Sequence, residues 1–382
     1  MKIVYCLNSI CYFGGIERVT ISKANALAEM PGNEVWIIVT ENYFAPVLPL
    51  SEKVRLVDLK VGYYLNQSKN VFVAMLQDIV RRHKHKERLT PVLEKIAPDV
   101  VIAVGQCEKY LVPTVRLASN PVYIREVHYY KHYRRDFADT VVKKILARMV
   151  EWYDFGWKCK KYDAIISLTE TDRLRYWQGN PKVRVMPNPI IARPSRRSTT
   201  TNKTVMAAGR LEEQKNFSAL LRIWQRVELR HPDWSLQIWG EGEQRSLLEE
   251  LIVSLGLKHV RLMGYSPDVI EHYPDASLFA VTSHYEGFAL MIVEAMAAGL
   301  PVVSYDCPCS PRDLIHDGVS GFVVAQEDEE SMADRICELI EDKELRKNMG
   351  EKAWQASICY GLDTVAQQWM NLFEELSKNA EA

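Results

Sequence analysis

Two carboxylates, Glu286 and Glu294, stand eight residues apart, and Glu294 is the single ionisable residue of an otherwise apolar helical segment over 289–298. A helix without a polar face is expected to be buried, and a buried carboxylate is costly unless it is paired or hydrogen-bonded. Glu294 therefore needs a partner. One interpretation is an internal ion pair with Arg210 or Arg312, and the other is a ligand held by both carboxylates.

The residues around this helical segment predict a strand, loop, helix, strand unit. The apolar runs 278–282 and 301–305 are typical of buried parallel strands, and Gly299 is a helix stop signal. Glu286 then lies in a loop at the carboxyl end of a strand, where open α/β sheets bind ligands. The following helix N-terminus offers N–H groups to an anion. We expect the two carboxylates to hold opposite ends of an elongated, polyhydroxylated ligand that contains phosphate.

A second pattern places two cations after an apolar strand over 204–208. Arg210 and Lys215 stand five residues apart, between the end of this strand and the start of a helical pattern. Two fixed cations at a strand's carboxyl edge are suited to bind a diphosphate. The alternative is a surface Arg and a helix-capping Lys.

These two motifs resemble those of one enzyme family. EGFALMIVEAMAAGLPVV, which contains Glu286 and Glu294, resembles the E-x7-E signature of the retaining glycosyltransferases of family 4 (glycosyl transferases group 1), and GRLEEQKN at 209–216 resembles their GRLxxxKG. The similarity implies an α/β protein with the GT-B fold, two doubly wound Rossmann-like domains facing a central cleft. It implies that Arg210 and Lys215 bind the donor pyrophosphate, Glu286 contacts the transferred sugar and Glu294 holds the ribose.

The resemblance extends to further residues and includes departures. GGIER resembles the family's GGxER, His128 follows a strand as in family members, and GEGE at 240–243 resembles the family's GxGxE. Asn216, Ala289 and Met291 replace residues that are commonly Gly, Gly and Pro. The implied catalytic residues are Arg210, Lys215, Glu286 and His128. The implied donor-binding residues are Gly14, Gly15, Gly209, Arg210, Lys215, Gly264, Tyr265, Glu286, Gly287, Phe288, Ala289, Leu290 and Glu294.

The family implies no metal and no cofactor, with the nucleotide sugar acting as co-substrate. The chain contains no Asp-x-Asp pair of the kind that metal-dependent transferases use. Its eight cysteines are expected to be free thiols in a reducing compartment.

The length of 382 residues predicts two domains, because a single core stops growing below that size. The polar stretch 193–203 has linker composition. We expect an acceptor-binding domain over 1–190, a nucleotide-sugar-binding domain over 191–363, and a C-terminal helix at about 364–382 that packs on the first domain. Strands are predicted at 2–7, 35–40, 54–59, 99–104, 122–126, 164–168, 183–186, 204–208, 235–239 and 260–263, and one amphipathic helix at 331–349.

Charge is unevenly distributed along the chain. Residues 1–190 carry 29 Lys and Arg against 19 Asp and Glu, a net +10, whereas residues 191–382 carry 19 against 30, a net −11. The positive charge is concentrated in Arg81–Arg88 and in Tyr129–Tyr162, where cations alternate with aromatic residues. A solvated helix face is one interpretation, and contact with an anionic membrane surface is the one that the aromatics favour. No nucleic-acid-binding motif, signal peptide or membrane-spanning run is present, so a cytoplasmic protein, peripheral to the membrane, is expected.

The expected activity is the transfer of a hexosyl or N-acetylhexosaminyl group, with retention, from a nucleotide-diphosphate sugar such as a UDP-sugar. The expected acceptor is a saccharide, lipid-linked, in surface polysaccharide or glycan assembly. Three alternatives stay open: a transferase with a soluble acceptor, a GT-B sugar-nucleotide epimerase, and a non-catalytic sugar-nucleotide sensor.

Overall fold

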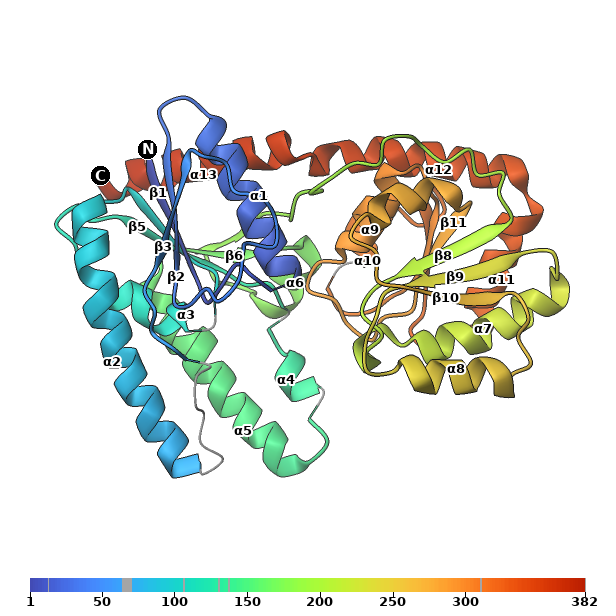
Figure 1. The fold of residues 1–382 in the computed structure, drawn as a ribbon, viewed down its shortest axis with the longest axis horizontal. Coiled ribbons are helices and arrows are strands. Elements are labelled where there is room, and N and C mark those ends of the chain that lie inside the picture. Colours follow the sequence, from blue (N-terminus) through green and yellow to red (C-terminus); the bar gives the residue numbers. More distant parts are fainter. Residues whose placement is uncertain are drawn as a thin grey trace. The chain divides into compact units, whose positions relative to one another are not determined.

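The computed structural model describes residues 1–12, 14–63, 71–105, 107–129, 131–136, 138–309 and 311–381. They form two compact units. Unit 1 comprises residues 1–168, 173–191 and 362–382, and unit 2 comprises residues 169–172 and 192–361. Each unit contains one parallel β-sheet with helices packed on its faces (Figure 1).

The sheet of unit 1 has seven strands in the order β3-β2-β1-β4-β5-β6-β7. They are β1 (Lys2–Leu7), β2 (Glu34–Val39), β3 (Val54–Asp58), β4 (Val100–Ala103), β5 (Val122–Glu126), β6 (Ala164–Ser167) and β7 (Val183–Val185). Every one was predicted to within one residue at either end. The central strands are nearly continuous apolar runs because both faces of a parallel sheet are covered.

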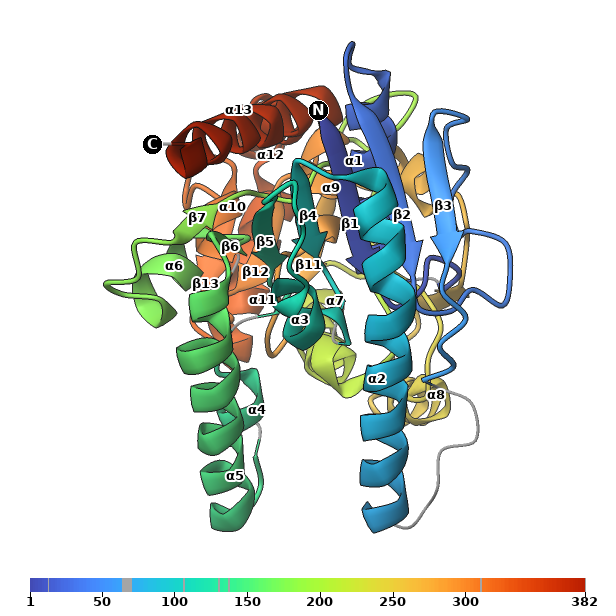
Figure 2. The same cartoon turned by 90° about the vertical axis from the view of Figure 1, so that its left-hand side faces the viewer.

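Helices cover both faces of this sheet. They are α1 (Gly15–Glu29), α2 (Val71–Ile96), α3 (Glu108–Leu111), α4 (Tyr133–Asp136), α5 (Val141–Glu151), α6 (Glu170–Tyr176) and α13 (Leu362–Glu381), with short η turns at Val112–Thr114, Trp152–Trp157 and Lys158–Lys161. The apolar sides of α1 and α13 share one core with the sheet, and the C-terminal half of α2 packs on the other face. The N-terminal ends of α2 and α5 extend beyond the sheet (Figure 2).

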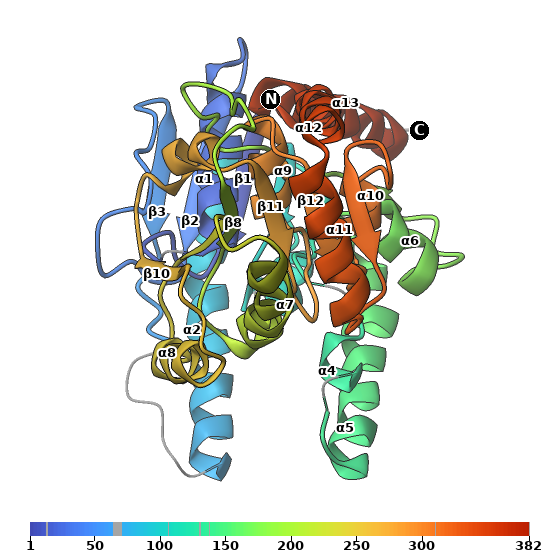
Figure 3. The same cartoon turned by 90° about the vertical axis from the view of Figure 1, so that its right-hand side faces the viewer.

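The sheet of unit 2 has six strands in the order β10-β9-β8-β11-β12-β13. They are β8 (Thr204–Ala208), β9 (Ser235–Trp239), β10 (Val260–Gly264), β11 (Leu278–Val281), β12 (Val302–Tyr305) and β13 (Gly321–Val324). The predictions for β8 to β12 are confirmed, and β13 was not predicted. Helices α9 (Leu290–Ala297) and α7 (Phe217–Arg230) lie on opposite faces of this sheet (Figure 3). The other elements are α8 (Arg245–Ser254), α10 (Pro311–Leu314), α11 (Glu329–Glu341), α12 (Lys343–Ser357), and η turns at Glu213–Lys215, Val269–Asp275 and Ile358–Tyr360.

Both sheets have the doubly wound arrangement, in which the chain moves outward from the first strand and then returns to its other side. The direction reverses between β1 and β4 in unit 1, and between β8 and β11 in unit 2. Ligands of open α/β sheets bind at the carboxyl ends of the strands where this reversal occurs. The two sheets therefore each offer one such position.

Helix α9 is buried as its composition predicted. From Ile292 to Ala297 every residue is buried, Glu294 included. The helix ends in a Schellman motif: Gly299, at φ +78°, donates its N–H to the Met296 carbonyl, and Leu300 donates to the Ala295 carbonyl. Glycine is needed here because the left-handed conformation strains other residues.

The single helix expected over 331–349 is wrong. The chain forms α11 and α12, separated at Asp342. Asp342 has an extended backbone, and its carboxylate accepts a hydrogen bond of 2.8 Å from the N–H of Leu345. An aspartate that caps a new helix competes with continuation of the previous one, which the apolar periodicity does not reveal.

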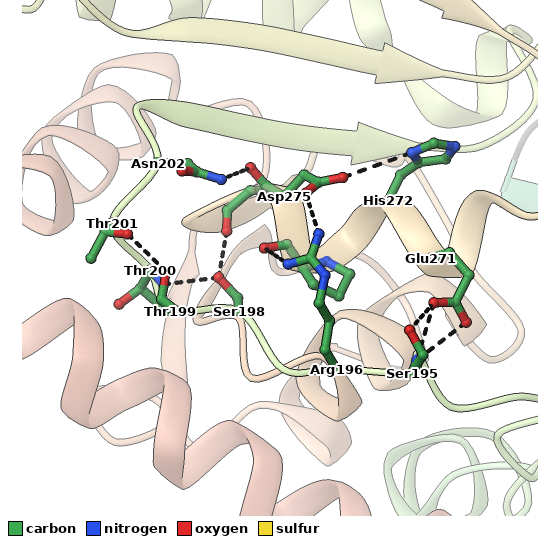
Figure 4. A network of polar contacts seen from close by, with 12 residues as sticks. Ser195, Arg196, Ser198, Thr199, Thr200, Thr201, Asn202, Glu271, His272 and Asp275 are labelled. Carbon is green, nitrogen blue, oxygen red and sulfur yellow. Dashed lines mark hydrogen bonds and ion pairs between the residues drawn. The ribbon is translucent and has the colours of Figure 1, made fainter.

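The polar segment 193–203 belongs to unit 2 and is fixed there by hydrogen bonds (Figure 4). The backbone N–H of Ser195 donates to the Glu271 carboxylate at 3.1 Å, Asn202 donates to the Asp275 carbonyl at 2.8 Å, and Arg196 pairs with the Asp275 carboxylate. The segment has the composition of a linker but follows an ordered path. Side chains form hydrogen bonds with backbone groups that are not paired within a strand or helix.

A buried ion pair joins three elements of unit 1. Lys23 of α1 lies 2.6 Å from Glu126 at the end of β5, with both side chains at most 1% exposed, and its ammonium lies 4.5 Å from the ring centre of Trp369 on α13. Burial opposes the ionised carboxylate, but the charge of Lys23 and the contact with His128 outweigh it and lower the pKa of Glu126 to about 2. This pairing therefore links α1, β5 and α13.

Replacing Lys23 by Met should lower the free energy of unfolding by about 3–5 kcal/mol, because it leaves the Glu126 carboxylate buried without a counter-charge. Urea unfolding of the full chain measures this change. Since the pKa of Glu126 is lowered in the folded state, its stabilisation is present above about pH 4.5 and is lost as the pH falls toward about 2.

The matched control is Lys23→Met combined with Glu126→Gln. Removing both charges together should cost much less than removing Lys23 alone. Equal losses in the single and double variants would show that the ion pair is not what stabilises this junction.

Candidate functional site

Two loops of unit 2 meet at the carboxyl ends of β8 and β11. Residues 209–216 follow β8, and residues 282–289 follow β11. The N–H of His284 donates to the Gln214 carbonyl at 2.8 Å, and the Gln214 side chain donates to the Tyr285 carbonyl at 2.9 Å. The Thr282 hydroxyl lies 3.1 Å from the Lys215 carbonyl oxygen. The sheet reversal therefore brings together two motifs that stand about 70 residues apart, and hydrogen bonds fix their geometry.

The centre of this arrangement is an ion pair. The Lys215 ammonium lies 2.7 Å from Glu286 Oε1, with the two side chains 12% and 7% exposed. A pair so little exposed is weakly screened by solvent and holds both charged groups in place. The charge of Glu286 also helps raise the pKa of the Cys307 thiol, although burial is the larger cause. Lys215 and Glu286 were both predicted as site residues, and the fold brings them into contact.

Arg210 lies on the same turn but is disposed differently. Its side chain is 67% exposed and its guanidinium lies 2.8 Å from Glu212 Oε1. Arg312, the other candidate for a pair with Glu294, lies 2.7 Å from Asp306. The turn therefore presents one largely buried cation, Lys215, and one exposed cation, Arg210, which is free to reorient toward an anion.

Close packing explains the glycines that follow β8 and β9. A Cβ atom on Gly240, at φ +137°, would lie 1.9 Å from the Gly209 carbonyl oxygen, and one on Gly209 would lie 2.9 Å from Cε of Lys215. The N–H of Gly240 donates to the carbonyl of Gly264 at 2.9 Å. The ends of β8, β9 and β10 are thus held in close contact, with Tyr265 beyond them 57% exposed.

Asn216 shows why this chain tolerates a departure from the family motif. Its backbone is left-handed, with φ 51° and ψ 43°, between the η turn over Glu213–Lys215 and α7. Glycine takes this conformation freely, and asparagine is the side chain that most often shares it. The replacement of Gly by Asn therefore leaves the path of the turn intact.

The N-terminus of α9 faces the same edge of the sheet. Ala289 is the N-cap residue, with φ −77°, and has no side chain that could cap the first turn. Gly287 and Phe288 precede it, and Phe288 packs edge-on against Tyr360 at 6.0 Å. Ala289 fits where the family commonly has Gly because φ is negative. Leu290 begins the helix, so backbone N–H groups point toward the loop that contains Glu286.

Glu294 has a polar partner that the sequence did not indicate. The Tyr273 hydroxyl, on the η turn over Val269–Asp275, donates to Glu294 Oε2 at 3.2 Å, and Tyr273 itself is 1% exposed. Its ring stacks on Phe279 of β11 at 5.3 Å. A tyrosine in a short turn carries no pattern that would associate it with a glutamate 21 residues later.

Three predicted site residues lie in unit 1. Gly14 is the N-cap of α1 and Gly15 its first residue. His128 borders a cavity of about 200 Å³ together with Asn8, Tyr12 and other residues at the carboxyl ends of β1 and β4. Nε2 of His128 lies 3.0 Å from the Glu126 carboxylate, which also binds Lys23. The fold therefore orients His128 through Glu126, a residue that the sequence did not single out.

The chemistry of the described residues is that of polar and ionic recognition. All eight cysteines are free thiols, and the described part of the chain contains no group of three or more His, Cys, Asp or Glu side chains placed to hold a metal ion. What the unit 2 edge offers is two cations, two carboxylates and a helix N-terminus.

Residues 191–356 match the family model of the glycosyl transferases group 1. An uncharacterized glycosyltransferase of Haemophilus influenzae is 26% identical over 378 residues, 97% of this chain and 99% of that protein. The amylovoran biosynthesis glycosyltransferase AmsD of Erwinia amylovora is 35% identical over 169 residues, which are 44% of this chain and 47% of AmsD. The chain thus spans nearly all of the first relative and about half of the second.

The same architecture occurs in a solved structure of low sequence identity. A variant of Staphylococcus aureus TarM, crystallised with fondaparinux, α-GlcNAc-glycerol and UDP, superposes with a TM-score of 0.75 at 17% identity, covering 97% of this chain and 99% of TarM. The family model, the relatives and the fold agree: residues 191–356 match the group 1 glycosyltransferases, and the chain has the GT-B fold.

Proposed function

We propose that this protein is a retaining family 4 glycosyltransferase that transfers a hexosyl or N-acetylhexosaminyl group from a UDP-sugar to a lipid-linked saccharide in surface polysaccharide or glycan assembly. The observation that carries the proposal is the Lys215–Glu286 pair, which lies with Arg210 and the N-terminus of α9 at the switch point of unit 2. Support for the donor and the pathway comes from TarM, crystallised with UDP, and from AmsD, which acts in amylovoran biosynthesis.

The chemistry rests on stabilisation of the leaving nucleotide diphosphate. Glu286 neutralises Lys215. When the donor binds, its diphosphate forms ion pairs with Lys215 and Arg210, and Glu286 accepts hydrogen bonds from the sugar hydroxyls. Negative charge grows on the phosphate as the glycosidic bond breaks, and each preorganised donor that meets it contributes about 3–4 kcal/mol. The first turn of α9, which follows Gly287 and Phe288, adds the field of a helix N-terminus.

Glu294 binds the nucleotide end of the donor. It lies within α9 and accepts from the buried Tyr273 hydroxyl through one oxygen, Oε2. A carboxylate can accept several hydrogen bonds, so it can also bind vicinal ribose hydroxyls while Tyr273 fixes its orientation. The backbone at Gly264 and Tyr265 contacts the base.

Unit 1 binds the acceptor. His128, oriented by Glu126, contacts the sugar near the reacting centre, and Gly14 and Gly15 let the backbone of the α1 N-terminus approach the donor phosphates. The positive charge of residues 1–190 favours a place at the anionic cytoplasmic surface of a membrane.

Transfer with retention can be tested directly on the product. Wild-type protein supplied with a panel of α-linked nucleotide sugars should release UDP only with its own donor and an acceptor extract, and the new linkage should be α by NMR of the anomeric proton. A β-linked product would overturn the retaining mechanism. Conversion of the donor to another sugar nucleotide without acceptor would identify an epimerase instead.

Replacing Lys215 by Ala should lower kcat by about 10²–10³ while the affinity for the UDP-sugar falls by only about tenfold, because the ammonium gains most when charge develops on the leaving phosphate. Steady-state kinetics and calorimetric titration measure the two quantities. The matched control is Lys203→Ala, which removes an exposed cation of the same unit and should change neither. Equal losses in affinity and turnover would show that Lys215 serves donor binding and has no separate role in the catalytic step.

Replacing Glu294 by Gln should weaken binding of UDP itself by about 10- to 100-fold, the value of a lost charge-assisted hydrogen bond. Glu286→Gln should weaken the UDP-sugar by a similar factor without weakening UDP, because Glu286 contacts the sugar and its charge is not needed by the diphosphate. Calorimetry of each variant with both ligands separates the two roles. The reverse pattern would show that the nucleotide and sugar ends are assigned the wrong way round.

A further inference from the structure

Helix α5 directs its apolar side chains to solvent. The helix and the residue that follows it expose Val141 (73%), Val142 (67%), Ile145 (53%), Leu146 (55%), Met149 (63%) and Trp152 (70%). With about 100° of rotation per residue, these side chains fall on one face that spans about half of the helix. A surface helix of a globular protein normally turns such a face toward the core. The pattern of α5 is the reverse.

The opposite side of the helix is held to unit 1 by polar contacts. Glu151, the last residue of α5, lies 2.8 Å from His132, and the buried Asp154 follows in the turn over Trp152–Trp157. Asp154 lies 2.7 Å from Arg125 and 2.6 Å from Lys109. The outward direction of the apolar face is therefore fixed by ion pairs, three members of which are at most 4% exposed.

Cations border the apolar face on both edges. Lys143, which pairs with Asp139 at 2.8 Å, lies on one side, and Lys144 and Arg148 lie on the other, all of them exposed. Beyond the helix, the ammonium of Lys158 lies 4.9 Å from the ring centre of Trp157, which is 49% exposed. Apolar side chains flanked by Lys, Arg and Trp are typical of helices that lie in the interface of a bilayer.

A second apolar surface lies at the same end of unit 1. The first turns of α2 expose Leu76 (64%), Ile79 (61%) and Val80 (66%). Figure 2 shows the N-terminal ends of α2 and α5 extending past the sheet at one end of unit 1. No helix among the described residues is both long and apolar enough to cross a membrane.

The basic cluster Arg81–Arg88 is engaged within unit 1 to a large extent. Lys84 donates to the Val61 carbonyl at 2.9 Å, Arg88 donates to the Leu59 carbonyl at 2.7 Å, and Arg82 pairs with Asp78 at 2.7 Å. Cations that are hydrogen-bonded in this way have less freedom to approach a surface. The surfaces of unit 1 that are better placed to contact a membrane are therefore α5 and the first turns of α2.

We propose that α5, together with the first turns of α2, inserts its apolar side chains into the interface of an anionic lipid bilayer. This deepens the membrane part of the proposed function, but it requires neither donor nor acceptor. A bilayer fits both features of the surface: its acyl region takes the apolar face, and its anionic headgroups take the cations on either edge. A second copy of the chain would place Lys143, Lys144 and Arg148 against their like-charged equivalents.

The test is flotation of the full-length protein with vesicles of phosphatidylglycerol and phosphatidylcholine, without nucleotide sugar. Ile145→Gln, Leu146→Gln and Met149→Gln combined should lower the partition coefficient by about tenfold or more, in low and high salt alike. Lys143→Gln, Lys144→Gln and Arg148→Gln combined should lower it at low salt, with a smaller effect at high salt, because salt screens the headgroup charge. The matched control is Leu229→Gln with Val253→Gln, which removes two apolar side chains of unit 2 that are 82% and 81% exposed and should bind as the wild type does.

Insertion has a second readout. Lipids brominated on the acyl chain should quench part of the tryptophan fluorescence, and Trp152→Phe should remove much of that quenching without changing flotation by more than a few-fold. Wild-type protein that fails to float at low salt, or an apolar variant that floats as the wild type does, would overturn the proposal. So would sedimentation that shows a wild-type dimer, a monomeric apolar variant and no flotation of either. Donor binding by calorimetry stays a separate measurement, so a failure of the membrane contact would leave the glycosyltransferase proposal standing.

Discussion

The ion pair between Lys215 and Glu286 is the interaction on which the edge of unit 2 depends. It joins a turn after β8 to a loop after β11, and the side chains are 12% and 7% exposed. At that degree of burial neither charge is well solvated, so each stabilises the other and both loops are held at one separation. The hydrogen bonds of Gln214 and Thr282 secure the same two loops through their backbones. Two opposite charges are thus positioned before any ligand arrives, which is what electrostatic preorganisation requires.

Unit 1 also contains a lysine–glutamate pair at the end of a strand, but this pair is more deeply buried. Glu126 ends β5 as Glu286 follows β11, and Lys23 neutralises it at 2.6 Å. That pair, however, is enclosed by Trp369 of α13, and its side chains are at most 1% exposed. A charge so enclosed can orient a neighbour, here His128, but cannot exchange its partner for a ligand. The degree of exposure therefore distinguishes a carboxylate that supports a site from one that can bind substrate.

Buried polar contacts also fix the orientation of α5. The contact between His132 and Glu151 and the buried ion pairs of Asp154 hold the helix by its polar side, and the apolar side is left to solvent. The exposed apolar side chains of α5 contribute nothing to the core of unit 1, and contiguous exposed apolar faces mark interaction surfaces. Burying charged groups and exposing apolar side chains both lower the stability of a fold. Their combination at α5 therefore indicates that the exposed face serves a function.

The sequence by itself determined every strand of both sheets except β13, the buried character of α9 and the position of two motifs at strand ends, because these follow from local composition. Short continuous apolar runs without Gly or Pro are typical of covered parallel strands, and Gly299 and Pro301 are helix stop signals. Local signals failed where two local preferences compete. The apolar periodicity of 331–349 runs through Asp342, but the carboxylate of Asp342 caps a new helix.

Tertiary structure alone decided which charges meet. Nothing in the spacing of the chain selects Tyr273 over Arg210 or Arg312 as a partner of Glu294, or Lys23 as the partner of Glu126 across 103 residues. The direction of the α5 face is likewise invisible in its amphipathic pattern, which is the same whether the apolar side packs on a core or faces a membrane. Partner choice depends on which side chains the sheet order brings within hydrogen-bond distance, and that distance is a property of the folded chain, because residues far apart in sequence meet only once the core has formed.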